Sequence, residues 1–149
     1  GSDFHQQSLI DATLGEYENA QKPFIPAVYH QYLKDVGRDK FAPVPTIKSQ
    51  LQFFSKNLVD AKQSIPLETG QCQLIVCNNV LIYFWQFEQR DIVRYLARYL
   101  ADDGVLLLGA GESLGFSDPD LQQIAVPTIH GYCKTVAPDW LKAVANIAR

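Results

Sequence analysis

Residues 72–84 read CQLIVCNNVLIYF, and this stretch decides the fold that we expect. Residues Leu74–Cys77 form an apolar run without polar alternation, which is typical of a strand buried on both faces in a parallel sheet. Asn78 and Asn79 follow at its carboxyl end, before the chain becomes apolar again over residues 80–84. Open α/β sheets bind their ligands at that end of their strands. The stretch therefore predicts a buried strand that delivers polar side chains to a site.

A second strand is also followed by an asparagine. Residues Leu51–Ser55 are predicted to form a strand, and Asn57 comes shortly after it. Two such strand ends suggest a polar cluster along one edge of the sheet. The alternative is that each amide caps the turn or helix that follows it. Capping is the better interpretation for Asn57, whereas both interpretations stay open for Asn78 and Asn79.

Composition limits the classes of protein to consider. The chain has 149 residues, of which 47% are hydrophobic and 19% charged, with a net charge of −3. These values are typical of one domain over residues 1–149 and argue against a disordered tail or a nucleic-acid binder. No apolar run approaches the roughly 18 residues of a membrane span, and no secretory signal is visible. We expect a cytoplasmic protein.

The three cysteines favour no metal or redox site. Cys72 and Cys77 lie five residues apart on one predicted strand, so they face opposite sides and cannot easily form a disulfide. The three histidines are scattered and share no ligand spacing with the cysteines. We interpret the thiols as buried apolar groups in a reducing compartment, and we expect no metal.

The two ends of the sequence carry their own expectation. The chain has no methionine, and Gly1 and Ser2 resemble the remnant of a cleaved expression tag. We therefore expect the chain to be a piece of a longer protein.

The remaining elements follow from apolar periodicity and from glycine and proline positions. We expect helices at 6–17, 26–34 and 86–101, the second of them within a small helical insertion at 21–50. We expect further strands at 105–108, 123–129 and 132–136, and a terminal helix or tail at 138–149. In the helix at 86–101, the expected buried stripe is Ile92, Val93, Leu96, Tyr99 and Leu100. This order of elements predicts an α/β fold with a mostly parallel sheet that ends in an antiparallel strand.

Few residues show a known catalytic spacing. Residues 109–115 read GAGESLG after a predicted strand, but the GxGxxxG spacing favours a glycine-rich bend over a phosphate loop. No serine or cysteine has a histidine at a motif spacing, and neither HExxH nor CxxC occurs. Tyr83 lies in an apolar run, where most tyrosines are core residues. Hydrolases and zinc enzymes are therefore not the leading hypotheses.

Several ordered motifs resemble those of the CheR family, the chemotaxis receptor glutamate methyltransferases. The matching stretches run through nearly the whole chain: SDF at 2–4 with Leu9, Ala12, Gly15 and Tyr17; the insertion at 25–36; FFSKNLVD at 53–60; CQLIVCNNVLIYF at 72–84; DGVLLLG at 103–109; and Glu112-Ser113. Together they are far more specific than any one of them alone.

The resemblance implies a partial class I, Rossmann-like methyltransferase fold that lacks the first strands. It implies transfer of a methyl group from S-adenosylmethionine to glutamate carboxylates of chemoreceptors, which are the expected protein partners. The resemblance implies that five residues bind the cofactor: Asp3 at the ribose, Asn57 and Leu58 beside the adenine, and Asn78 and Asn79 at the cofactor's edge. It places Tyr83 near the transferred methyl group. A carboxylate that accepts hydrogen bonds from a vicinal diol is a sound physical fit for Asp3.

The sequence also departs from the family pattern. The family's arginine is Asn78 here, its His-Ser pair is Ala110-Gly111, and the acidic residue after its NVLIYF motif is Trp85. Two functions therefore remain open. One is part of an active methyltransferase, inactive by itself and with weak cofactor affinity. The other is a CheR-like binding or scaffold module without catalysis. For the chain alone we expect an incomplete sheet and self-association as a homodimer.

Overall fold

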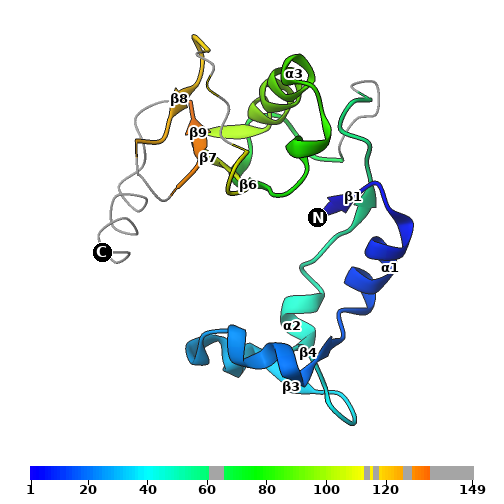
Figure 1. The fold of residues 1–149 in the computed structure, drawn as a ribbon. Coiled ribbons are helices and arrows are strands. Elements are labelled where there is room, and N and C mark those ends of the chain that lie inside the picture. The colour runs from blue at the N-terminus through cyan, green and yellow to red at the C-terminus, as the bar shows by residue number, and fades with distance from the viewer. Residues whose placement is uncertain (61–65, 113–114, 116–117, 126–128, 135–149) are drawn as a thin grey trace. The chain divides into compact units, whose positions relative to one another are not determined.

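A computed structural model describes residues 1–60, 66–112, 115, 118–125 and 129–134 of the chain. The chain divides into two compact units, Gly1–Asp60 and Ala61–Arg149 (Figure 1). The expectation of one domain over residues 1–149 stays a prediction.

The first unit begins with a short parallel strand pair. Strand β1 (Ser2–Asp3) pairs with β5 (Phe54–Ser55), with Ser2 opposite Phe54 and Asp3 opposite Ser55. The strand predicted at 51–55 is therefore only two residues long, because its partner β1 has only two residues that pair with it. Ser2, expected as part of a tag remnant, and Asp3, expected to bind the cofactor, thus both belong to a two-stranded sheet.

Helix α1 (Gln6–Leu14) follows β1 and ends three residues before the predicted end at Tyr17. The cause is Gly15, which takes the left-handed conformation with φ of 59° and donates its N–H to the carbonyl oxygen of Asp11 at 2.8 Å. Glycine adopts this conformation without the steric cost that other residues incur, so it ends helices readily. Tyr17 consequently lies in strand β2 (Tyr17–Glu18).

The predicted small helical insertion contains a sheet as well as helices. Its 3-10 helices are η1 (Asn19–Phe24) and η2 (Ala27–Tyr32), so the expected helix at 26–34 is a 3-10 helix, and α2 (Pro45–Lys48) closes the segment. Strands β3 (Leu33–Asp35) and β4 (Lys40–Pro43) join β2 in an antiparallel sheet of order β2-β4-β3. Phe41 on β4 is buried and stacks on the Tyr17 ring at 5.7 Å between centroids.

The second unit contains a four-stranded sheet of order β6-β7-β9-β8 (Figure 1). Strands β6 (Cys72–Cys77) and β7 (Leu100–Leu108) are parallel, and β9 (Gly131–Cys133) runs antiparallel to both β7 and β8 (Gln122–Gln123). The predicted α/β class and its closing antiparallel strand are confirmed. The parallel part of this sheet is a single pair, smaller than expected. The predicted tail at 138–149 lies outside the described residues.

Strand β6 is not buried on both faces, and this corrects the expectation for residues 74–77. It is the edge of its sheet, and Leu74 and Val76 are 51% and 63% exposed. Leu74 lies opposite Val105 on β7, whose side of the sheet is covered by Ile124. That cover does not extend to β6. The apolar run therefore marks an edge strand with one exposed face, which an unalternating sequence cannot reveal.

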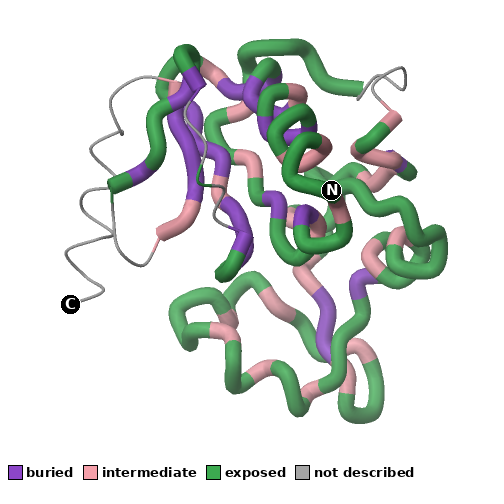
Figure 2. The backbone as a smooth tube through the Cα atoms, turned by 45° about the horizontal axis from the view of Figure 1, so that its top comes forward, coloured by how far each residue is buried: buried purple, intermediate pink, exposed green. Residues whose placement is uncertain are grey.

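Helix α3 (Gln86–Ala97) covers part of the same sheet and is shorter than the predicted 86–101. The predicted buried stripe is confirmed, because all five of its residues are buried. Most buried residues of the unit gather on α3, β7 and β9 (Figure 2). The helix ends early because Leu100 already belongs to β7, where it pairs with Cys72.

Residues 102–104, which lie between the predicted helix at 86–101 and the predicted strand at 105–108, form an irregularity inside β7. Cys72 pairs with Leu100 and Leu74 with Val105, so β7 carries extra residues between two regular pairs. A Cβ atom on Gly104 would lie 2.6 Å from the Cys72 carbonyl oxygen, so only glycine fits there. Within the described part of the chain, no helix is long and apolar enough to cross a membrane.

Candidate functional site

The loop that follows β6 carries three of the residues singled out from the sequence. Asn78 and Asn79 come directly after Cys77, and Tyr83 ends the 3-10 helix η3 (Leu81–Tyr83). Asn79 has φ of 57°, in the left-handed region that asparagine tolerates better than most residues. The left-handed backbone alone is therefore a structural reason for an asparagine at position 79, apart from any role toward a ligand.

A buried carboxylate holds this loop in place. Glu112 is 4% exposed and accepts four backbone N–H groups. Its Oε2 lies 2.9 Å from the nitrogens of both Asn79 and Gly109. Its Oε1 lies 2.7 Å from the nitrogen of Leu81 and 3.3 Å from that of Ile82. One side chain therefore ties the loop after β6 to the loop after β7.

The hydrogen bonds offset the cost of burying this charge. A carboxylate has about four acceptor positions, and here four donors use them. The charge also affects the neighbouring thiol of Cys77. Burial and the negative charge of Glu112 raise the pKa of Cys77 from 9.0 to about 11. None of the three cysteines forms a disulfide, and Cys77 and Cys133 are buried.

Gly109 lies where the two loops approach most closely. A Cβ atom there would lie 2.4 Å from Glu112 Oε2, 2.6 Å from Asn78 Oδ1 and 3.0 Å from the nitrogen of Asn79. Its own N–H is used by Glu112, and the N–H of Glu112 bonds the Gly109 carbonyl at 3.0 Å. The structure thus supports the glycine-rich bend rather than a phosphate loop, because a protein carboxylate already occupies this N–H.

The asparagine side chains in this loop do not act as helix caps. The residue at the start of η3 is Val80, with no side-chain cap, and neither amide of Asn78 or Asn79 has a hydrogen-bond partner among the described residues. Tyr83 is 79% exposed, so it is not the core residue that apolar flanks suggest. The polar groups of all three residues are thus available to a ligand.

The other predicted site residues lie in the first unit. Asp3 ends β1, and its Oδ1 accepts the N–H of His5 at 2.8 Å. The carbonyl oxygen of Asp3 accepts the N–H of Lys56, at 3.0 Å, which places Asn57 at the same strand end. Asn57 Oδ1 accepts the N–H of Val59 at 3.2 Å, so the capping interpretation of Asn57 is confirmed. Leu58 is half-buried in the turn that follows.

The predicted site residues therefore form two groups. Asp3, Asn57 and Leu58 come together at the end of β1 and β5, whereas Asn78, Asn79 and Tyr83 share the loop after β6. Glu112 was not among the predicted site residues, although it belongs to a matched family motif. The sequence signal that could have indicated Glu112 is an acidic residue three positions after Gly109, a glycine at the end of a predicted strand.

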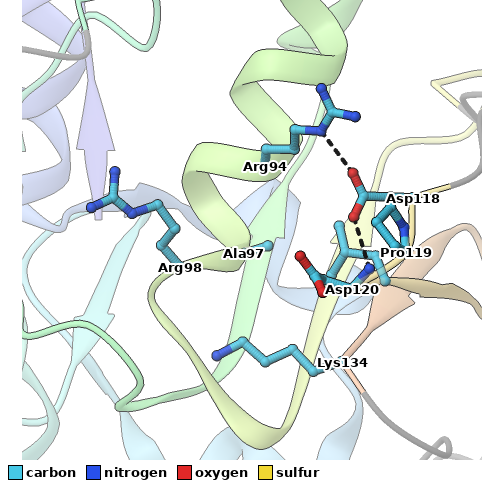
Figure 3. A pocket seen from close by; sticks show the side chains of 8 residues that line it. Arg94, Ala97, Arg98, Asp118, Pro119, Asp120 and Lys134 are labelled. Atoms are coloured by element: carbon cyan, nitrogen blue, oxygen red, sulfur yellow. Dashed lines mark hydrogen bonds and ion pairs between the residues drawn. The ribbon is translucent and has the colours of Figure 1, made fainter.

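A separate cavity of about 720 Å³ lies in the second unit, and Figure 3 shows it from close by. Its lining comes mainly from the end of α3 and from residues 118–121, and it includes none of the predicted site residues. Arg94 donates from Nε to Asp118 Oδ2 at 2.7 Å. This hydrogen bond, with that from the N–H of Asp120, lowers the pKa of Asp118. Among the described residues, no three acidic, histidine or cysteine side chains form a metal site.

Comparison with known proteins gives the family. Residues 1–129 match the family described as CheR methyltransferase, SAM binding domain. The chain is 32% identical over 115 residues to chemotaxis protein methyltransferase 1 of Pseudomonas aeruginosa, covering 76% of this chain and 40% of that protein. It is 30% identical over 115 residues to chemotaxis protein methyltransferase Cher2 of Pseudomonas putida, with the same coverage of 76% and 40%.

A third relative is chemotaxis protein methyltransferase 1 of Vibrio cholerae, 32% identical over 115 residues that cover 74% of this chain and 40% of the relative. The chain thus spans about 40% of the length of these curated relatives. The family match extends over most of the chain and includes both groups of site residues. The chain belongs to the CheR methyltransferase family.

Proposed function

We propose that this chain forms part of an S-adenosylmethionine-dependent methyltransferase that acts on glutamate carboxylates of chemoreceptor-type proteins in the cytoplasm. The observation that carries the proposal is the match of residues 1–129 to the SAM-binding domain of CheR methyltransferases. The relatives named chemotaxis protein methyltransferases support the same substrate class.

The donor set of the first unit suits the ribose of the cofactor. Asp3 is exposed, and within the described part of the chain its Oδ2 has no hydrogen-bond donor. A carboxylate oxygen with unused lone pairs can accept both hydroxyls of a vicinal diol. Asn57 and Leu58, at the same strand end, would lie along the adenine. In this proposal the cofactor supplies a methyl group on a positively charged sulfur.

The loop after β6, in the second unit, carries the other residues that the proposal assigns to cofactor and acceptor. Among the described residues the side-chain amides of Asn78 and Asn79 have no hydrogen-bond partner, so they would bind at the cofactor's edge, and the Tyr83 ring is exposed. A glutamate acceptor is already ionised at neutral pH, so no general base is required of the protein. The Tyr83 hydroxyl would donate a hydrogen bond to one acceptor oxygen and thereby orient the other. The residues act by alignment and by exclusion of water.

A second function stays open, namely a CheR-like binding or scaffold module without catalysis. The observation in its favour is Asn78, which replaces the arginine of the family pattern and so removes a charge and a two-pronged donor. The intact Asp3, Asn57, Asn79 and Tyr83 favour the enzyme.

Calorimetry with S-adenosylhomocysteine, the demethylated product, tests cofactor binding in the full-length protein that carries this chain. We expect Asp3→Ala to weaken binding by more than about tenfold, because a charged hydrogen-bond partner of a diol is worth roughly 1.5–3 kcal/mol. Asp11→Ala is the matched control and should bind normally, because among the described residues the side chain of this exposed aspartate on α1 accepts a hydrogen bond only from Gln7. Equal affinity in Asp3→Ala and the unmodified protein would remove the ribose assignment.

A methyl-transfer assay with a chemoreceptor fragment as acceptor separates the two functions. Transfer to glutamate supports the enzyme. Product binding without transfer to any acceptor carboxylate favours the binding module.

A further inference from the structure

The loop Asn78–Tyr83 contains little regular structure of its own. Of its six residues, only Leu81–Tyr83 form a single 3-10 turn, and Asn79 is in the left-handed region. A loop of this kind keeps one conformation only where its surroundings determine it. Its backbone donors therefore show what holds it.

Those donors converge on Glu112. The N–H groups of Asn79, Leu81 and Ile82 all reach its carboxylate, and the fourth donor is Gly109 on the neighbouring strand end. No lysine or arginine ion pair reaches this carboxylate among the described residues, so backbone N–H groups alone balance its charge. Three of the four donors belong to the loop that carries the candidate site residues, so Glu112 holds mainly that loop.

We propose that Glu112 is a positioning residue of the methyl-transfer site, whose carboxylate fixes the backbone of Asn78–Tyr83 before any ligand binds. This inference rests on the proposed function. Glu112 is buried beneath the loop and is argued to act through Asn79 and Tyr83, with no contact to substrate of its own. Its effect is to reduce the ordering that cofactor and acceptor would otherwise have to impose on the loop.

The choice of an ionised carboxylate has a chemical reason. Each oxygen accepts two N–H groups, so both ends of the side chain must be acceptors. A glutamine has the same shape but presents an NH₂ group at one end. That group would face two N–H donors, either those of Asn79 and Gly109 or those of Leu81 and Ile82, and the pair that it faces would lose its acceptor.

Glu112→Gln in the full-length protein is the direct test. We expect S-adenosylhomocysteine to bind at least about tenfold more weakly and turnover to fall, because hydrogen bonds to a charged group are lost at the loop. Glu112→Asp keeps the charge and should recover part of both. Glu88→Gln is the matched control: Glu88 Oε2 accepts one backbone N–H, that of Trp85 at 2.9 Å, outside the loop. It should leave affinity and turnover unchanged.

Two readouts separate positioning from a purely structural role. The pKa of the Cys77 thiol, which burial and the charge of Glu112 raise, should fall in Glu112→Gln if the charge is present as described. Amide NMR shifts of Asn79 and Gly109 should move in the same variant while those of α3 stay. A folded Glu112→Gln that binds product with unchanged affinity overturns the proposal.

If Glu112→Gln does not fold, amide hydrogen exchange in the unmodified protein decides. The proposal predicts that the amides of Asn79 and Leu81, which donate to Glu112, are protected without product. Protection that arises only when product binds overturns it. Failure of the unmodified protein to bind product would instead contradict the proposed function, and the exchange measurement would still report on Glu112 independently.

Discussion

Arg94 donates from Nε to Oδ2 of Asp118 at 2.7 Å, and this pair ties helix α3 to the segment before β8. The hydrogen bond from Arg94 is the main cause of the lowered pKa of Asp118. A carboxyl group whose pKa is lower in the folded state contributes stability above its unfolded pKa and loses it as pH falls through the folded value. The pair therefore sets a pH dependence of unfolding.

We expect Asp118→Asn to destabilise the chain at pH 7 and to differ less from the unmodified protein as the pH falls below about 4, where an unperturbed aspartate becomes protonated. Urea unfolding at pH 7, 4 and 3 measures the difference. Asp120→Asn is the control, since the described residues show Asp120 contributing only its backbone N–H to this pair. A difference for Asp118→Asn that does not change with pH would contradict the ion-pair explanation.

Gly109→Ala should destabilise the second unit by about 1–3 kcal/mol, the usual cost of overpacking. The new methyl group would lie 2.4 Å from Glu112 Oε2 and 2.6 Å from Asn78 Oδ1, so both side chains would have to move. Thermal unfolding followed by circular dichroism measures the effect. Gly115→Ala should change little, because no atom of the described residues lies within 4 Å of the added carbon. Equal melting temperatures for the two variants would show that the two loops are less closely packed than described.

Cys77 should resist alkylation in the folded protein up to about pH 9. Its pKa of about 11 leaves little of the reactive thiolate, and the side chain is buried. Cys72, which is partly exposed, should react first. Mass spectrometry after timed treatment with iodoacetamide identifies the modified residue, and unfolding in urea should make both residues react. Modification of Cys77 ahead of Cys72 in the folded protein would be incompatible with this burial and charge.

Tyr83→Phe in the full-length protein should lower turnover more than affinity for S-adenosylhomocysteine. The change removes only the hydroxyl, and the exposed ring contributes little to the core. A lost hydrogen bond to a charged acceptor corresponds to roughly tenfold or more in rate. Single-turnover methyl transfer measures it. Tyr29→Phe, another exposed tyrosine, serves as the control in the first unit. Unchanged transfer would leave Tyr83 without a role in the reaction.

The chain by itself should self-associate through the exposed face of β6. This strand is a sheet edge with Leu74 and Val76 exposed, and free edges with apolar faces favour pairing with a second copy. Solution scattering over a concentration series measures the oligomeric state. Val76→Lys should shift it toward the monomer, while Gln73→Lys, the same charge on an exposed residue of the same strand, should have less effect. A monomer at all concentrations would contradict the expected homodimer.

The sequence predicted best what depends on periodicity over a long segment. All five residues of the buried stripe at 92–100 are buried, although the helix ends at Ala97 and Leu100 reaches its burial from strand β7. Periodicity reports burial, and the helix end depends on pairing with Cys72, a contact from a distant part of the sequence.

Strand burial and the structure of the insertion were harder to predict. The apolar run at Leu74–Cys77 gave the strand correctly but not its exposed face, because exposure depends on what covers the sheet. The antiparallel strands β3 and β4 in the insertion have three and four residues, too few for a recognisable alternation. Glu112 was missed because its role depends on three backbone groups about 30 residues away.

The irregularity at Asp102–Gly104 has a consequence for how this sequence can change in length. A strand that slips by one residue turns every side chain to the opposite face, so β7 tolerates no insertion between Val105 and Leu108. Asp102 and Asp103 lie outside the regular pairs and are exposed. Residues gained or lost there leave the pairing of Leu74–Cys77 intact. This short segment is therefore the place where an engineer can vary the spacing between the Leu100 and Val105 pairs of β7 at least cost.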